Sequence, residues 1–397
     1  MRIPSIAFVL FASIAAATAP AAAQLAGNPA APSGAGAQAP PWNRYLTPRT
    51  LDADGIEELF ERVARTGGVA HLPGGNYRIN RTIRLAGLGP IRIEGEGWGA
   101  YTNPRGDGFR AVPTRLLWTG PQGGTMFHLD GSAGMSFSHL QFHGGDRAGR
   151  LFLLTSRPGF GTSNIRFTRA LFTAADVAIQ CGIDEKDFNN ADLVYDEVMF
   201  FGVGTGLRTV NHQSLNHHFR SLSALHVGTV FDMQRGGNLN VDGFAAGTFD
   251  LLLRVGYGGW NAGTYRFTAG RPEMNGRTRR HARLVEATPA DICRVVFEAT
   301  QESMGPIDEK LPDNADEAAF KVGKGASVIL RDHYHARLVL EQTGGVFRDI
   351  DGRWNGEDLG RIAASGNSSG RAATGAGRVE IVRPSDPTGA PLEEVRR

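Results

Sequence analysis

The sequence predicts an all-β solenoid with one helix at its N-terminal end. Three observations support this: a helix-to-strand segment at residues 54–85, a degenerate repeat of 19 to 29 residues after it, and an excess of glycine. The chain holds 53 glycines in 397 residues, about twice the usual share of ~7%. Glycine-rich repeats with two short strands each are typical of stacked coils, each burying its apolar face against its neighbours.

The first residues have the pattern of a secretory signal. Arg2 gives a positive start, residues 6–16 are apolar, and Ala21–Ala23 offer a small-residue cleavage site. We therefore expect a signal peptide over residues 1–23, cleaved after Ala23, and a secreted or periplasmic protein. An uncleaved anchor is the alternative, although the apolar run is shorter than the ~20 residues of a spanning helix. No other segment is expected to span a membrane.

Low-complexity segments flank the predicted solenoid. Residues 24–42 are rich in Ala, Gly and Pro, which predicts a flexible linker. Residues 356–397 are rich in Gly, Ser, Ala and Arg, which predicts a mostly disordered tail with one candidate last strand at Arg378–Arg383. The β-helix domain is thereby expected over residues 43–355.

The first element is a short amphipathic helix. Ile56, Leu59, Phe60 and Val63 share one face of Asp54–Arg65 at the i, i+3, i+4, i+7 spacing. A glycine turn, a short apolar strand, a Pro-Gly-Gly turn and alternating apolar residues follow over residues 67–85. This order predicts a helix that feeds a pair of strands.

Residues 67–77 have the pattern Gly-Gly-Val-x-x-Leu-Pro-x-Gly-x-Tyr, and the helix precedes them. This segment resembles the start of pectate-lyase-like (pectin lyase-like superfamily) proteins. The resemblance implies an all-β, right-handed parallel β-helix (solenoid) with an N-terminal capping helix, and a polysaccharide partner. It is strong over 52–97 and continues to about 350 only as a repeat pattern. The Asn-x-Asp, Asp-Asp, Gly-His-Gly and Arg-x-Pro-x-x-Arg motifs of enzymes in this superfamily are missing, so the reaction is left open.

Two series of short strands alternate after this segment. The glycine- or alanine-led series covers 124–130, 149–155, 175–181, 204–210, 228–234 and 247–253. The second series covers 137–142, 165–172, 193–200, 218–225 and 239–244. Asparagine tolerates left-handed backbone geometry, so corners are expected at Asn164, Asn190, Asn216 and Asn238.

The first series predicts a groove. Its fourth and sixth positions are mostly large and apolar, such as Phe127, Leu207 and Phe231, and should point inward. The fifth and seventh positions should then face outward: His128, Asp130, Leu153, Thr155, Ile179, Cys181, Arg208, Val210, Asp232 and Gln234. A row of outward side chains on successive coils is how the fold that the chain resembles forms a carbohydrate groove.

Four residues are predicted to be catalytic. Arg208 and Asp232 occupy equivalent places on adjacent coils, and Arg208 could stabilise the carboxylate of a uronic acid while Lys186 or His212 removes its C5 proton. The alternative for Arg208 and Asp232 is a surface ion pair on a sheet face, which contributes little.

Substrate-binding residues are predicted beside them. The polar loop at residues 182–190 leaves the end of a groove strand and carries Asp184, Glu185, Lys186 and Asp187. The residues expected to bind substrate are His128, Asp130, Gln234, Arg235, Glu185 and Asp187. A solvated loop is the alternative for residues 184–187.

No metal site is predicted. The spacing of His212, His217 and His218 matches no zinc pattern, and residues 332–335 are expected to end a strand. No cofactor is expected, with calcium as an alternative from a loop-like pattern at residues 349–357. Cys181 and Cys293 should be free, buried thiols, because about four coils at ~4.8 Å each separate them.

Composition and motifs together predict function at the level of class. A formal net charge of +2 and the lack of a basic run exclude nucleic acid as the expected partner. The leading prediction is a polysaccharide lyase that acts on uronic-acid residues by proton abstraction and β-elimination. A polysaccharide hydrolase is one alternative. A non-catalytic glycan-binding or envelope-structural protein is another, with aromatic platforms at Trp118, Tyr257, Trp260 and Tyr265.

Overall fold

A computed structural model describes residues 44–98, 113–256, 262–289, 291–336 and 339–350, with the backbone of 353–354 and 378–382. The predicted signal peptide, the linker at 24–42, most of the predicted tail, Tyr257 and Trp260 lie outside the described residues. Within the described ranges, no helix has the length and apolar character needed to cross a membrane.

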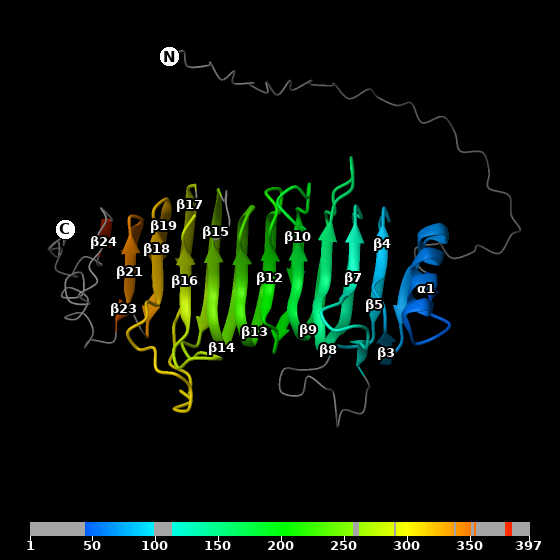
Figure 1. Cartoon of the computed structure of the whole chain (residues 1–397), viewed down its shortest axis with the longest axis horizontal. Helices are drawn as coiled ribbons and strands as arrows, with labels where there is room; N and C mark the ends of the chain where they lie inside the picture. Colours follow the sequence, from blue (N-terminus) through cyan, green and yellow to red (C-terminus); the bar gives the residue numbers. More distant parts are fainter. Residues whose placement is uncertain are drawn as a thin grey trace, which may run out of the picture. The chain divides into compact units, whose positions relative to one another are not determined.

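The described chain is a parallel β-helix whose coils stack along one axis (Figure 1). Every pairing between its named strands is parallel, and each coil contributes to three sheets. Four long strands bend around the corners and run through all three sheets: β8 Ser136–Thr155, β9 Arg166–Cys181, β13 Leu215–Met233 and β14 Gly237–Val255. The predicted all-β, right-handed parallel β-helix is confirmed.

The shorter strands complete the sheets. The first sheet adds β1 Tyr45–Leu46, β2 Val69–Leu72, β5 Arg92–Gly95, β10 Leu193–Asp196, β15 Gly263–Pro272, β17 Cys293–Glu298, β19 Ala326–Arg331, β22 Val346–Ile350 and β24 Arg378–Val382. The second adds β3 Gly75–Ile79, β6 Thr114–Trp118, β11 Met199–Phe201 and the end of β15. The third adds β4 Ile83–Ala86, β7 Thr125–Asp130, β12 Thr205–Thr209, β16 Arg283–Ala287, β18 Phe320–Gly323 and β21 Leu340–Thr343. Two short strands, β20 Tyr334–His335 and β23 Arg353–Trp354, pair separately.

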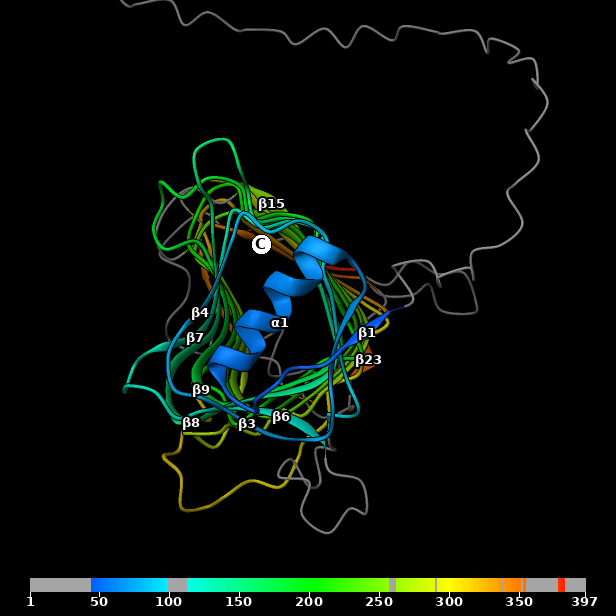
Figure 2. The same ribbon diagram turned by 90° about the vertical axis from the view of Figure 1, so that its right-hand side faces the viewer.

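The N-terminal helix closes one end of the solenoid. Helix α1 spans Ala53–Thr66 and lies across the mouth of the coils, as the view along the axis shows (Figure 2). Its predicted apolar face is buried, and Asp52 caps it by accepting a hydrogen bond from the Gly55 amide at 2.9 Å. A side chain at Gly55 would meet the Thr50 carbonyl at 2.3 Å, so glycine is required there.

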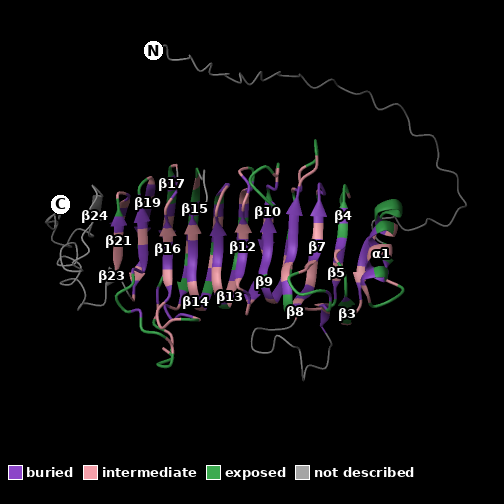
Figure 3. Ribbon diagram, in the orientation of Figure 1, coloured by how far each residue is buried: buried purple, intermediate pink, exposed green. Residues whose placement is uncertain are grey.

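Most strand residues are buried, as the colouring by burial shows (Figure 3). Aromatic rings stack on one another in this core. Phe152 is fully buried and lies between rings of neighbouring coils, with centroids 5.0 Å from Phe127 and 4.9 Å from Phe167. Trp118 and Tyr265 belong to this core, with 2% and 0% exposure. They are therefore not the predicted aromatic platforms, because both point inward on their strands.

The predicted assignment of inward and outward positions in the glycine- or alanine-led strands is correct in most coils and wrong in one. Phe127, Phe152, Leu207 and Phe231 are fully buried, as expected. Ile179 pairs with Leu207 and Cys181 with Thr209, so both point inward, and Gln180 takes the outward place beside Arg208. The error arose because this strand begins at Ala175 without the glycine that marks the register in its neighbours.

One corner is formed by a ladder of polar residues with left-handed backbone. Asn164, Asn216 and Asn238 have φ of 55°, 58° and 61°. Asn216 donates to Asp192 at 2.9 Å, and Asp192 has a φ of 59°. The predicted corner at Asn190 is therefore at Asp192, and Asn190 is buried instead.

Both cysteines are free and buried, as predicted. Cys181 ends its segment of the third sheet, whereas Cys293 begins β17 of the first sheet, so the two lie on different sides of different coils. Burial raises the pKa of each thiol to about 12, so neither is a reactive thiolate at neutral pH.

Candidate functional site

The outer face of the third sheet carries one unbroken cross-strand row. Each member pairs with the next on the adjacent coil. The row reads Arg84, His128, Leu153, Gln180, Arg208, Asp232, Arg254, Glu286, Lys321 and Glu341. Coils are spaced ~4.8 Å apart, so the row is long enough to follow an extended polymer over several residues.

Arg208 and Asp232 form the predicted pair on adjacent coils. Arg208 Nε donates to Asp232 Oδ2 at 3.0 Å, and Gln234 Nε2 donates to the same oxygen at 3.0 Å. The Arg208 side chain is partly exposed, but Asp232 is only 2% exposed. The expectation that Asp232 faces solvent is therefore wrong: it lies on the outer side of the strand, covered by its partners.

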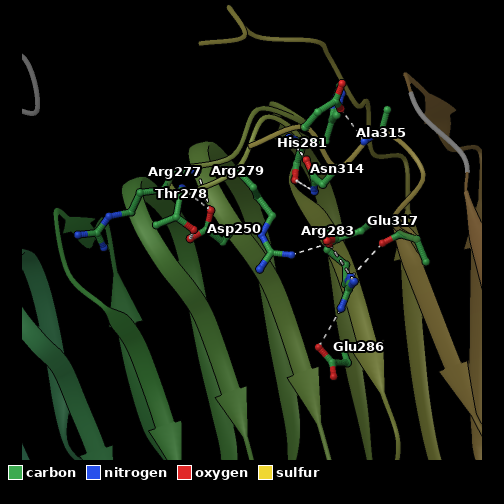
Figure 4. A network of polar contacts seen from close by, with 12 residues as sticks. Asp250, Arg277, Thr278, Arg279, His281, Arg283, Glu286, Asn314, Ala315 and Glu317 are labelled. Carbon is green, nitrogen blue, oxygen red and sulfur yellow. Dashed lines mark hydrogen bonds and ion pairs between the residues drawn. The ribbon is translucent and has the colours of Figure 1, made fainter. Parts of the chain in front are cut away.

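In the C-terminal half of the row, Arg254 forms an ion pair with Glu286 and Lys321 with Glu341. Further ion pairs surround Glu286 (Figure 4). Arg283 lies 3.2 Å from Glu286 and 3.5 Å from Glu317, and Arg279 lies 2.5 Å from Glu317. The loop before β16 is fixed further by Asp250, whose carboxylate accepts from the amide of Arg277 at 2.8 Å. With their charges paired to each other, these side chains offer little to a ligand.

The loop at residues 182–190 reaches across several coils. Asp187 Oδ1 accepts from the amide and the hydroxyl of Ser156, at 2.7 and 2.5 Å, and Asp187 Oδ2 accepts from the Ile183 amide at 3.0 Å. On the other side, Glu185 forms an ion pair with Arg235 at 2.7 Å, and Arg235 contacts His212 Nε2 at 3.1 Å. Four predicted site residues thus hold the loop in place.

A hollow of about 660 Å³ lies beside this loop, over the early coils of the third sheet. It is open to solvent and bounded by the loop at 182–190, the turn at 156–159, β4 and β7. Its lining residues are Arg84, His128, Asp130, Thr155, Ser156, Arg157, Pro158, Gly159, Ile183, Asp184, Lys186, Asp187 and Phe188. We call it the His128 pocket.

A chain of hydrogen bonds sets the proton positions in this pocket. Arg84 Nη2 donates to Asp130 Oδ2 at 2.5 Å, and Thr155 Oγ1 donates to Asp130 Oδ1 at 3.2 Å. The single hydroxyl proton of Thr155 is thereby used, so at the 2.7 Å contact Thr155 Oγ1 accepts from His128 Nε2–H. A neutral His128 with its proton on Nε2 carries a free lone pair on Nδ1.

The pKa shifts agree with this assignment. Burial lowers the pKa of His128 below its usual value, although Asp130 partly opposes this. Burial opposes ionisation of Asp130, but the hydrogen bonds from Arg84 and Thr155 hold its pKa below the usual value. At neutral pH the pocket therefore contains a neutral imidazole beside an ionised carboxylate.

Two cations in the pocket remain available to a ligand. Among the described residues, neither Arg157 nor Lys186 forms an ion pair. The Arg157 guanidinium lies against the turn at Gly87, where a side chain would come within 2.0 Å of Nη2. The carboxylates of Asp130 and Asp187 already accept hydrogen bonds from protein groups. The pocket groups still able to bind a ligand are therefore mostly hydrogen-bond donors.

Exposed apolar side chains gather beside the pocket. Phe160, Ile183 and Phe188 are 62%, 62% and 58% exposed. Ile183 and Phe188 line the pocket, and Phe160 pairs with Arg157 across the adjacent turn. Large exposed apolar groups gathered in one place mark binding surfaces.

The structure divides the predicted site residues into two groups. His128, Asp130, Lys186 and Asp187 meet in the His128 pocket. The others lie further along the row or beside it: Arg208, Asp232, Gln234, Arg235, Glu185 and His212. The loop reaches Arg235, but none of its described hydrogen bonds or ion pairs reaches Arg208 or Asp232.

Sequence reasoning missed Arg84 and Arg157 and did not assign a role to Thr155. Arg84 precedes the recognised repeat, yet it lies in the row because β4 pairs with β7. Arg84 lies two residues before the end of β4, the last strand of the first strand pair. This position in the sequence was the available signal. Arg157 lies in a turn, where no periodic pattern indicates direction.

Comparison with known proteins gives the fold. The sequence matches no known protein-family profile and no curated protein. Among solved structures, the tailspike of Acinetobacter phage vb_AbaP_AS12 is similar with a TM-score of 0.52 and 10% identity, over 89% of this chain and 66% of that chain. This supports the β-helix architecture.

Two enzyme structures show a weaker likeness. The catalytic domain of a GH87 α-1,3-glucanase in complex with nigerose has a TM-score of 0.47 and 12% identity, over 90% of this chain and 70% of that chain. DFA-IIIase from Arthrobacter chlorophenolicus A6 in complex with GF2 has a TM-score of 0.40 and 12% identity, over 89% and 97%. The chain spans 61% of the length of ORF18 of Geobacillus virus E2.

Proposed function

We propose that this protein is an exported polysaccharide lyase that binds an extended, uronic-acid-containing chain along the third sheet and cleaves it in the His128 pocket. The observation that carries the proposal is the Asp130–Thr155–His128 hydrogen-bond chain, which presents an unprotonated Nδ1 beside available cations. The β-helix likeness to a phage tailspike is compatible with a polysaccharide-active protein but does not select the reaction.

The proposed reaction is β-elimination. A uronate carboxylate paired with Arg157 or Lys186 acidifies the neighbouring C5 proton. His128 Nδ1 takes that proton, the C5–H electron pair forms the C4–C5 double bond, and the C4–O bond breaks. The departing oxygen takes a proton from the Lys186 ammonium or from water. Asp130 and Thr155 act as positioning residues, because they fix the tautomer of His128.

The rest of the row supplies binding. Arg208 lies three strand steps from His128, which is ~14 Å along the axis. Its partly exposed guanidinium suits a second carboxylate further along the polymer. Phe188, at the edge of the pocket, offers an apolar face to a sugar ring.

A hydrolase fits the pocket less well. Glycoside hydrolysis needs two carboxyl groups, one of which stays protonated to act as the acid. Asp130 is held ionised, and both oxygens of Asp187 already accept hydrogen bonds. The third carboxylate of the pocket, Asp184, is exposed and already accepts from the Lys186 amide at 2.8 Å.

The test is to incubate the purified protein with a panel of acidic and neutral polysaccharides. Unsaturated products, read by their near-ultraviolet absorbance, should appear with an acidic member of the panel. We expect His128→Ala to lower kcat by about 10²–10⁴-fold, while His218→Ala, an exposed histidine on the first sheet, retains activity. New reducing ends without unsaturated product would identify a hydrolase, and binding without turnover a non-catalytic binder.

A further inference from the structure

A buried polar cluster occupies the core near the C-terminal coils, away from the third-sheet row. It comprises Glu302, His333 and His335, all at most 3% exposed. One potential ligand atom from each lies within 4.8 Å of the other two. The sequence prediction placed a strand end here and no site.

In this cluster the potential ligand atoms of the three side chains lie close to one another. His333 Nε2 lies 2.7 Å from Glu302 Oε1, and His335 Nδ1 lies 3.6 Å from the same oxygen. The two imidazole centroids are 4.4 Å apart. His333 and His335 are separated by one residue in an extended segment, so period-two alternation places both rings on the same side.

The outward atoms of all three residues are held by other partners. His335 Nε2 lies 3.0 Å from Asp349 Oδ2, and His333 Nδ1 contacts the Thr300 hydroxyl. Glu302 Oε2 accepts from the Ala336 amide at 3.0 Å. Metal-binding histidines usually donate their second N–H to a carboxylate or another oxygen acceptor in this way, which fixes the ring and its tautomer.

We propose that Glu302, His333 and His335 bind a divalent transition-metal ion, zinc being the ion that this donor set suits. Two neutral imidazole nitrogens and one carboxylate oxygen are ordinary zinc ligands. A doubly charged cation would also balance the negative charges that Glu302 and Asp349 bring into the core, where unpaired charge is costly.

The surroundings assign the ion a structural role. The rings of Phe297 and Phe320 lie 6.0 and 6.5 Å from His333. Glu302 follows β17, His333 and His335 follow β19 with His335 in β20, and Asp349 comes from β22, so the ion would tie three successive coils together. Since metal and core would form together, the binding energy would contribute to folding.

The competing account is a metal-free ion-pair network. Burial opposes charge on His335, but its hydrogen bonds to Asp349 and Glu302 raise its pKa to about 9. A protonated His335 could thus hold the cluster together without a metal. The two accounts differ in metal content and in the dependence of refolding on metal.

The experiment begins with the full-length protein purified without chelator or an immobilised-metal column. Elemental mass spectrometry should find a near-stoichiometric amount of a first-row divalent metal. The protein is then unfolded with a chelator and refolded with or without Zn²⁺, and with Co²⁺ as a spectroscopic probe. We expect Tm to rise by several degrees with metal, and the Co²⁺ form to show visible d–d absorption.

Variants separate the ligands from ordinary buried histidines. Glu302→Gln should abolish metal retention and the metal-dependent rise in Tm. The matched control is His217→Asn, since His217 is equally buried but contacts Ser214 at 3.2 Å instead; it should retain the metal. Wild-type protein that carries no metal and refolds to the same Tm with and without Zn²⁺ or Co²⁺ would overturn the proposal, whether or not any variant folds.

Discussion

Thr155→Val tests the hydrogen-bond chain on which the proposed reaction depends. The substitution keeps the side-chain shape and removes the one hydroxyl that links His128 and Asp130, at 2.7 and 3.2 Å. Asp130 keeps its bond to Arg84, and His128 loses the acceptor that holds its proton on Nε2.

The magnitudes follow from these contacts. Loss of a hydrogen bond to the ionised Asp130 lowers the free energy of unfolding by about 1.5–3 kcal/mol. The lower value is expected here, because Arg84 still donates to Asp130. Loss of the His128 contact is worth about 0.5–1.5 kcal/mol, and the same amount taken from the transition state lowers kcat by roughly 2- to 13-fold. The predicted variant is a few degrees less stable and several-fold slower.

The assay pairs thermal unfolding with initial rates of unsaturated-product formation on the polysaccharide that wild type cleaves. Thr155→Ser keeps the hydroxyl and should recover most of kcat, whereas a purely structural role would leave kcat the same in both variants. Full kcat in Thr155→Val, together with the expected loss of stability, would refute the role of Thr155 in fixing the His128 tautomer.

Three further predictions concern the core, the row and pH. Phe152→Ala should lower the free energy of unfolding by about 3–5 kcal/mol, measured by denaturant titration, because it opens a cavity within the aromatic stack; a loss below 1 kcal/mol would contradict tight packing there. Arg208→Ala should raise KM and leave kcat nearly unchanged, since Arg208 lies ~14 Å from His128; a fall in kcat alone would place Arg208 at the reaction. Burial lowers the pKa of His217 to about 4, below the unfolded value of ~6.5, so the unfolded chain takes up the proton first. Stability should therefore fall by up to ~3 kcal/mol as pH drops from ~6.5 to 4, and His217→Asn should remove that part of the slope.

The sequence by itself determined the architecture. Short-range periodicity is enough to place apolar residues such as Phe127, Leu207 and Phe231 inside, because strand alternation has a period of two. The capping helix was equally predictable from the sequence, since Ile56, Leu59, Phe60 and Val63 form its buried face. The free thiols followed from the separation of Cys181 and Cys293 along the solenoid.

Only the tertiary structure decided which polar side chains meet. The one-residue register error at Cys181 shows the limit, because a strand without a leading glycine gives two equally good alternations. Thr155 joins Asp130 to His128 only because the next coil stacks on β7. Likewise, Glu302 and His335 lie far apart in the sequence and meet in the core through coil stacking, which side-chain periodicity within one strand does not encode.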